Sequence, residues 1–93
     1  MKMTAGEAAK FCGGRIICGN PETEITSAVV DSRQVKPGAL FVPIVGEKTN
    51  AHQYVGKAFQ SGAAAALTQE GEIAGAGGVQ IAVDDTRIAL QRI

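Results

Sequence analysis

Two polar loops flank an apolar run in the middle of the chain, and most residues that could bind a ligand lie in these loops. The first loop is Asp31–Gly38, the apolar run is Ala39–Val45, and the second loop is Gly46–His52. The loops contain carboxylates, cations, hydroxyls and glycines, whereas the run reads as a buried strand. Ligands of α/β proteins bind in crevices at strand ends, so we expect the site here.

The second loop contains Gly46, Glu47, Lys48 and Thr49 in succession, which invites comparison with a nucleotide-binding P-loop. A P-loop requires Gly-x-x-x-x-Gly-Lys-Ser/Thr, with the lysine directly after the second glycine. Here Glu47 intervenes, and Phe41 occupies the position of the first glycine. The stretch therefore does not predict an ATP site.

The same loop could still bind an anion. A strand end followed by glycine, Lys48 and Thr49 at a helix N-terminus offers backbone N–H groups, a cation and a hydroxyl. The alternative is that Glu47 and Lys48 are merely solvated and that Asn50 only caps the next helix. The residue types leave both interpretations open.

The first loop opens with Asp31, Ser32 and Arg33, directly after a predicted strand. Aspartate and serine in such a position often form turns with the backbone, and Arg33 can pair with Asp31 or Glu47. His52, at the end of the second loop, could act as a general base. No Ser, Cys or Asp lies at a spacing that suggests a catalytic triad, so we expect His52 to fix the loop.

Metal binding is not predicted. Cys12, Cys18 and the single histidine cannot readily form a structural zinc site. Asp84 and Asp85 could be Mg²⁺ ligands, but adjacent carboxylates at a helix start more often act as caps. Gly71–Gly78 is rich in glycine but precedes a strand, whereas a dinucleotide-binding loop follows one.

The bulk composition indicates one small globular domain. The 93 residues are 45% hydrophobic, and nine basic residues balance nine acidic ones. This balance, with only 4% aromatic residues, argues against nucleic-acid binding. No apolar run approaches the roughly 20 residues needed to cross a bilayer, and no export signal opens the chain. Reduced cysteines and a cytoplasmic location are therefore expected.

The order of elements predicts an α/β fold: a small layered domain with a mixed, largely parallel sheet flanked by helices. A capping box at Thr4–Glu7 begins the first helix, and Gly13-Gly14 ends it. A second helix is expected from His52 to Ser61. The expected strands are Arg15–Cys18, Glu24–Val30, Leu40–Val45, Ala63–Thr68 and Val79–Val83.

Two further expectations concern the ends of elements. Pro43 cannot donate a ladder hydrogen bond, so it predicts an edge-facing N–H position or a bulge in its strand. Asp84-Asp85-Thr86 can cap a last helix, with Ile88, Ala89, Leu90 and Ile93 on one side. The pattern of this helix is incomplete at the end of the sequence, which suggests a fragment of a longer protein.

Taken together, these residues resemble the N-terminal domain of the Mur ligases. The chain reads Asp-Ser-Arg-x-Val-x-Pro-Gly-x-Leu-Phe-Val from Asp31, Gly-Glu-Lys-x-x-x-His from Gly46, and Ser-Gly-Ala-x-Ala from Ser61. The family pattern is Asp-Ser/Thr-Arg, Pro-Gly-x-Leu-Phe-Val-Ala, Gly-Glu-Arg-x-Asp-Gly-His and Gly-Ala. The Val-Asp-Asp-Thr-Arg-x-Ala-Leu stretch from Val83 is most similar to the MurF branch, the UDP-N-acetylmuramoyl-tripeptide–D-alanyl-D-alanine ligases.

The resemblance implies part of a cytoplasmic, three-domain, ATP-dependent ligase of peptidoglycan precursor synthesis. Residues 1–93 would be the domain that holds the UDP part of a UDP-N-acetylmuramoyl-peptide, with no cofactor and no catalytic residue of its own. ATP and Mg²⁺ would bind a central domain. Both this domain and the C-terminal domain are absent from this chain. The expected partners are that substrate and the rest of the same chain.

The resemblance also implies which residues contact UDP. They are the residue before the Asp-Ser-Arg aspartate, its serine, and the residues after the glycine that ends the Leu-Phe-Val strand. In this chain these positions are Val30, Ser32, Glu47, Lys48 and Thr49. The residues expected to shape the two loops are Asp31, Arg33, Gly46, Asn50 and His52. For both loops to reach one ligand, the strands before them should be parallel neighbours.

The chain departs from the family pattern at four positions. Lys48 replaces arginine and so keeps the charge but lacks the bidentate fork. Ala51 replaces glycine, which puts a positive φ there in doubt. Asn50 replaces aspartate, and Pro43 replaces alanine.

Two alternatives remain open at the level of sequence. The first is the MurE branch, whose members add the third peptide residue. The second is a non-catalytic regulatory or interaction module on the same fold, similar to the N-terminal domain of HPr kinases. The second alternative predicts no response to UDP.

Overall fold

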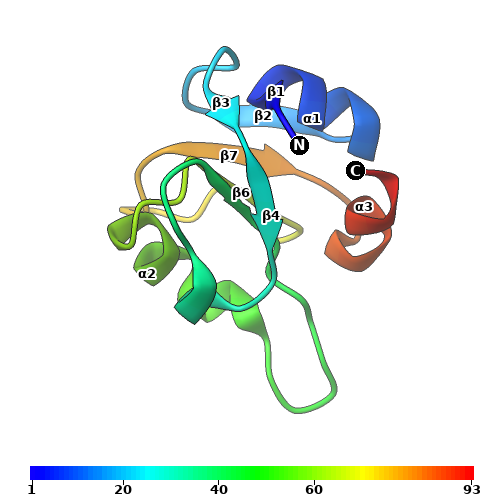
Figure 1. Cartoon of the computed structure of the whole chain (residues 1–93). Helices are drawn as coiled ribbons and strands as arrows, with labels where there is room; N and C mark the ends of the chain where they lie inside the picture. The colour runs from blue at the N-terminus through cyan, green and yellow to red at the C-terminus, as the bar shows by residue number, and fades with distance from the viewer.

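The computed structural model describes all 93 residues and contains seven short strands. These are β1 (Met3–Thr4), β2 (Arg15–Cys18), β3 (Glu24–Ile25), β4 (Ser27–Val29), β5 (Ala39–Phe41), β6 (Ala65–Thr68) and β7 (Val79–Ala82). Five of them form one sheet in the order β2-β7-β6-β5-β4, in which only β2 runs antiparallel to its neighbour. The predicted mixed, largely parallel sheet is confirmed (Figure 1). β1 and β3 form a separate antiparallel ribbon.

Helices cover both faces of this sheet (Figure 1). They are α1 (Ala5–Cys12), α2 (Val55–Gln60), α3 (Thr86–Arg92) and the 3₁₀ helices η1 (Ser32–Gln34) and η2 (Ala51–Tyr54). The predicted capping box of α1 is present. The Glu7 N–H donates to the Thr4 hydroxyl at 3.1 Å, and the Glu7 carboxylate accepts from the Thr4 N–H at 2.9 Å. Gly13 ends α1 with a φ of 73°, a conformation that glycine adopts without a Cβ penalty.

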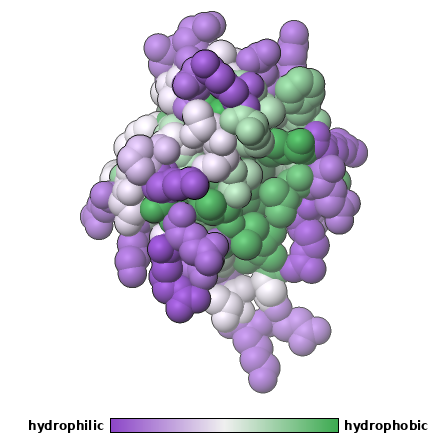
Figure 2. Space-filling model, in the orientation of Figure 1, coloured by the Kyte–Doolittle hydropathy of each residue, from purple (hydrophilic) through white to green (hydrophobic).

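The central strands bury side chains on both faces, as expected of a parallel sheet covered by helices. In β5, Leu40 belongs to the cluster beneath α1 and α3, and Phe41 to the cluster beneath α2. In β6, Leu67 belongs to the first of these clusters and Ala66 to the second. The outer surface is largely polar, with an apolar area between β4 and α3 (Figure 2).

Two predicted strands differ substantially from the structure, whereas Ala63–Thr68 and Val79–Val83 differ only by one or two residues at one end. Glu24–Val30 is not one strand: it divides at Thr26, so that β3 pairs in the ribbon and β4 in the main sheet. Leu40–Val45 is shortened to β5, which ends at Phe41. Pro43 therefore needs neither the edge-facing position nor the bulge that we expected. β5 lies between β4 and β6, and the ladder stops before the residue that lacks an N–H.

The two other helices were predicted with errors at their edges. The segment from Ala51 begins as η2 and becomes α-helical only at Val55. In α3, Asp85 is the N-cap, as predicted, and Ala89 is buried. Ile88 does not share the buried side, since it is 49% exposed.

The parallel pairing of β4 and β5 confirms the geometric expectation for the two loops. Ser27 is opposite Ala39, and Val29 is opposite Phe41. The carboxyl ends of both strands therefore meet at one edge of the sheet. The first loop leaves β4 at that edge, and the segment that leads to the second loop leaves β5 beside it.

The difference between Ile81 and Ile88 allows a matched test of this core. Ile81 in β7 is fully buried, whereas Ile88 is half-exposed. Ile81→Val should lower the free energy of unfolding by about 0.5–1.5 kcal/mol, because it leaves a small cavity. The identical change Ile88→Val should cost less than about 0.5 kcal/mol. Urea titrations followed by circular dichroism measure both, and equal losses would contradict the assigned burial.

Candidate functional site

A cavity of about 550 Å³ lies at the carboxyl end of β4. One wall comes from the first loop, directly after β4, and the other from η2 and α2. The wall residues are Val30, Asp31, Ser32, Arg33, Ala51, Tyr54 and Lys57. Of the residues predicted from the sequence, the structure therefore brings Val30 and Ser32 together with Asp31 and Arg33.

The first wall is fixed by a local ion pair. Asp31 caps η1 by accepting the Arg33 N–H at 2.9 Å, and the Arg33 guanidinium contacts its carboxylate at 2.8 Å. Hydrogen bonds from the Arg33 side chain and backbone lower the pKa of Asp31 to about 2. Of the two predicted partners, Arg33 pairs with Asp31 and not with Glu47. Its charge is thus largely balanced, as is that of the carboxylate.

Ser32 differs from its neighbours because its side chain is uncommitted. The backbone of Ser32 begins η1, and the residue lines the cavity at intermediate exposure. No side-chain hydrogen bond of the chain involves its hydroxyl. This hydroxyl can therefore donate to or accept from a ligand without breaking an existing contact.

The second loop forms a hairpin that projects from the body of the molecule (Figure 1). Val45 and Asn50 form an isolated antiparallel bridge, and the Gly46 N–H donates to the Thr49 carbonyl at 2.7 Å. Glu47, Lys48 and Thr49 are exposed at its tip. They are not among the residues that line the cavity. The hairpin rejoins the cavity wall at Ala51, but the two predicted parts of the site do not line one pocket.

His52 fixes the base of this hairpin, as expected. It is 5% exposed, its Nδ1 lies 2.7 Å from Oδ1 of Asn50, and its Nε2 accepts the Gln69 N–H at 3.0 Å. These partners assign a neutral imidazole with the proton on Nδ1. Burial lowers the pKa of His52, and the Glu70 carboxylate at 3.6 Å opposes that shift. A group so enclosed is unsuited to act as a general base on a bound ligand.

Gln69 extends the contacts of His52 to the start of α3. Its side-chain oxygen accepts the Thr86 N–H at 3.0 Å and faces the Thr86 hydroxyl at 3.2 Å. That hydroxyl also donates to the carbonyl of Pro43. Hydrogen bonds thus connect the hairpin base, the turn after β6, the segment after β5 and the first turn of α3.

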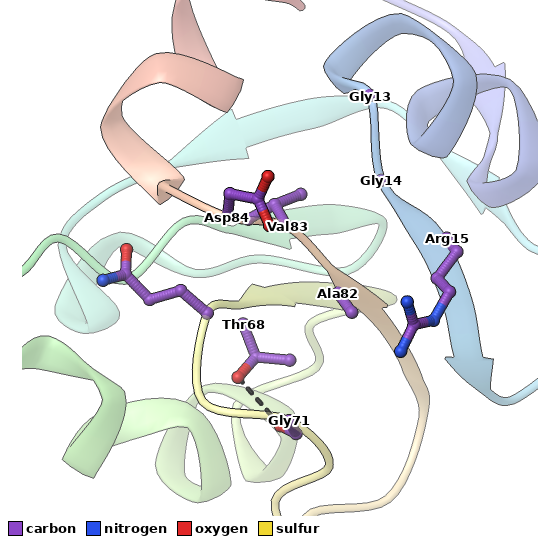
Figure 3. Close-up of a pocket in the computed structure, with 9 residues that line it drawn as sticks. Gly13, Gly14, Arg15, Thr68, Gly71, Ala82, Val83 and Asp84 are labelled. Carbon is purple, nitrogen blue, oxygen red and sulfur yellow. Dashed lines mark hydrogen bonds between the residues drawn. The ribbon is translucent and has the colours of Figure 1, made fainter.

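A second crevice of about 410 Å³ lies at the same edge of the sheet, between β2 and the ends of β6 and β7 (Figure 3). Arg15 and Asp84 supply opposite charges to it, and the Thr68 hydroxyl is already bonded to the Gly71 carbonyl at 2.9 Å. Asp85 is committed as the cap of α3. None of the predicted site residues lines this crevice, so the cavity at β4 remains the candidate site.

Comparison with known proteins identifies the family. A model of the Mur ligase family, catalytic domain, matches residues 24–93. The chain belongs to the Mur ligase family. Over 72 residues it is 39% identical to the UDP-N-acetylmuramoyl-L-alanyl-D-glutamate--2,6-diaminopimelate ligase of Syntrophomonas wolfei, covering 77% of this chain and 15% of that protein. Over 90 residues it is 32% identical to the UDP-N-acetylmuramoyl-tripeptide--D-alanyl-D-alanine ligase of Haemophilus influenzae, covering 97% and 19%.

A structural comparison supports the same family. The crystal structure of MurF from Acinetobacter baumannii superimposes with a TM-score of 0.86 at 29% sequence identity. The match covers 99% of this chain and 20% of that one. The resemblance to the N-terminal domain of Mur ligases is confirmed, and the chain spans about a fifth of these relatives or less. No helix of the chain has the length and apolarity needed to cross a membrane.

The sequence did not single out Tyr54 and Lys57. Tyr54 ends η2, Lys57 lies in the first turn of α2, and both line the cavity, whereas Val55 and Ala58 are fully buried. The helical spacing of this segment allows either Tyr54 or Val55 on the buried side with Ala58, and the structure buries Val55. The sequence could not show that the first loop lies across the cavity from Tyr54 and Lys57.

His52 gives a test of the hairpin base, because it is the only histidine of the chain. Its pKa in the folded protein should lie below 6.5, since burial disfavours the imidazolium. The unfolded chain then binds more protons, so the free energy of unfolding should fall as the pH drops below about 6.5, down to the folded pKa. NMR titration of the imidazole and urea titrations at several pH values measure these effects.

Two variants sharpen this titration. Glu70→Gln should lower the pKa of His52 further, because it removes the carboxylate that opposes the shift. His52→Gln should flatten the dependence of stability on pH between 7 and 5. A normal or raised pKa of His52 in the wild-type chain would refute the enclosed, neutral imidazole.

Proposed function

We propose that this chain anchors the UDP part of a UDP-N-acetylmuramoyl-peptide for an ATP-dependent ligase that adds D-alanyl-D-alanine in cytoplasmic peptidoglycan precursor synthesis. One observation carries the proposal. The open cavity at β4 is lined by Val30 and the uncommitted hydroxyl of Ser32, two positions that the resemblance assigns to UDP. Relatives from the same family are, by name, ligases of UDP-N-acetylmuramoyl peptides.

In this proposal the chain binds the part of the substrate that does not react. Contacts to the non-reacting UDP end would position the distant peptide carboxylate for reaction elsewhere in the ligase. Lys48 at the exposed hairpin tip would supply a charge near the diphosphate, with Glu47 and Thr49 beside it. ATP and Mg²⁺ would bind the part of the ligase outside this chain. The chain alone would bind UDP weakly, because other domains would complete the site.

The proposal is tested by titrating UDP into the ¹⁵N-labelled chain and following backbone amide signals. We expect shifts at Val30–Arg33 and at Gly46–Asn50. Ser32→Ala should weaken binding about 2- to 10-fold, as expected for the loss of one hydrogen bond. Shifts confined to Gly71–Gly78, with both loops silent, would overturn the placement and favour a non-catalytic module.

A second candidate is the MurE type of ligase, which adds the third peptide residue. The 39% identity to a 2,6-diaminopimelate ligase supports this alternative, whereas the superposition on MurF supports the first. An assay of the entire ligase would separate them. With the UDP-tripeptide substrate, consumption of D-alanyl-D-alanine supports our proposal. Consumption of 2,6-diaminopimelate with the UDP-dipeptide substrate would refute the D-alanyl-D-alanine assignment.

A further inference from the structure

Of the three hydrophobic residues in the cavity walls, two are large and exposed. Val30, between β4 and the first loop, is 48% exposed, and Tyr54, at the junction of η2 and α2, is 39% exposed. Tyr54 is the single tyrosine of the chain, which has no tryptophan. Phe41 is fully buried, so it cannot present its ring to a ligand here. Tyr54 is thus the one aromatic residue that lines this cavity.

The fold holds Tyr54 at the surface. The next residue, Val55, is fully buried against the sheet, as is Ala58 one turn later. The backbone N–H of Val55 donates to the carbonyl of His52, which continues η2 into α2. With Val55 and Ala58 anchored in the core, the Tyr54 side chain is held at the surface, at the edge of the buried face. Its exposure is therefore a consequence of the helix register.

The charges of the cavity leave one cation free. Arg33 is paired with Asp31 at 2.8 Å, so these two charges largely cancel. Lys57 is exposed and takes part in none of the ion pairs of the chain. It follows Tyr54 by three residues, and residues so spaced are neighbours on a helix surface. The cavity therefore has an aromatic residue, a free hydroxyl and a free ammonium group.

We propose that Tyr54 stacks on the nucleobase of a bound nucleoside diphosphate and that Lys57 binds its diphosphate, as a second recognition wall opposite Ser32. This inference rests on the proposed function and names two contact residues that the resemblance did not supply. Aromatic side chains stack on any nucleobase face, and lysine binds phosphate as a mobile point charge. In this arrangement Tyr54 contributes to the binding of the nucleoside, and Lys57 only to that of the phosphates.

The test compares three probes, namely uridine, UDP and inorganic pyrophosphate, by NMR titration of the 93-residue chain. Tyr54→Ala should weaken the binding of uridine and of UDP alike, by about 5- to 150-fold, and leave the binding of pyrophosphate unchanged. Lys57→Ala should weaken the binding of UDP and of pyrophosphate by about 3- to 10-fold and leave the binding of uridine unchanged. The effect of this variant should be smaller at high salt, because salt screens the charge of the lysine. Tyr54→Phe should retain most of the affinity, because it keeps the ring.

Matched controls come from α1, which packs on the other face of the sheet. Phe11→Ala removes an aromatic side chain that is 55% exposed, and Lys10→Ala removes an exposed lysine. Neither residue lines the cavity, so neither change should affect the three probes. A loss of affinity as large as that of the Tyr54 or Lys57 variants would contradict the assignment to this wall.

A measurement on the wild-type chain keeps the proposal testable even if the Tyr54→Ala variant does not fold. Since the chain has one tyrosine, its ring protons give one set of signals, which should move upfield when uridine stacks on the ring. UDP binding that shifts Ser32, with an unmoved tyrosine ring and unchanged affinity in the Lys57 variant, would overturn this inference alone. No UDP shift at either loop would instead overturn the proposed function as well.

Discussion

The parallel pairing of β4 with β5 is the constraint on which the candidate site depends. Because Val29 is opposite Phe41, both strands end at the same level of the sheet. The first loop can then form η1 beside the segment that descends from the hairpin into α2. With the register shifted by one residue, Phe41 would leave the cluster under α2, and the buried face that anchors Tyr54 and Lys57 would be lost.

The charges near the site follow from a short local arrangement. Asp31 caps η1 and pairs with Arg33 two residues on, so these two charges largely balance each other while the Arg33 side chain stays exposed. In the proposed function the anion would be bound by Lys48 and Lys57, whose flexible stems lack the bidentate geometry of arginine. This fits a site that holds its ligand by several modest contacts.

Local signals predicted the fold well, and distant contacts account for what the sequence missed. The capping box of α1 involves residues three apart, and its pattern is readable directly. The division of Glu24–Val30 at Thr26 was not readable, since β-branched residues continue through the break. Pro43 indicated a conflict, but only the position of β5 between two neighbours shows that the strand ends early. The contact of His52 with Gln69 spans 17 residues, and the cavity that Tyr54 lines is completed by the distant residues Val30–Arg33.

The hydrogen bonds among His52, Gln69, Thr86 and Pro43 join four segments that are far apart in sequence. Since each bond is shared by two segments, the hairpin base cannot detach without exposing donors and acceptors at the start of α3. The amides of Gln69 and Thr86 should therefore become accessible to hydrogen exchange in one cooperative opening. A change in the stability of the hairpin base would therefore also change the local stability at the start of α3.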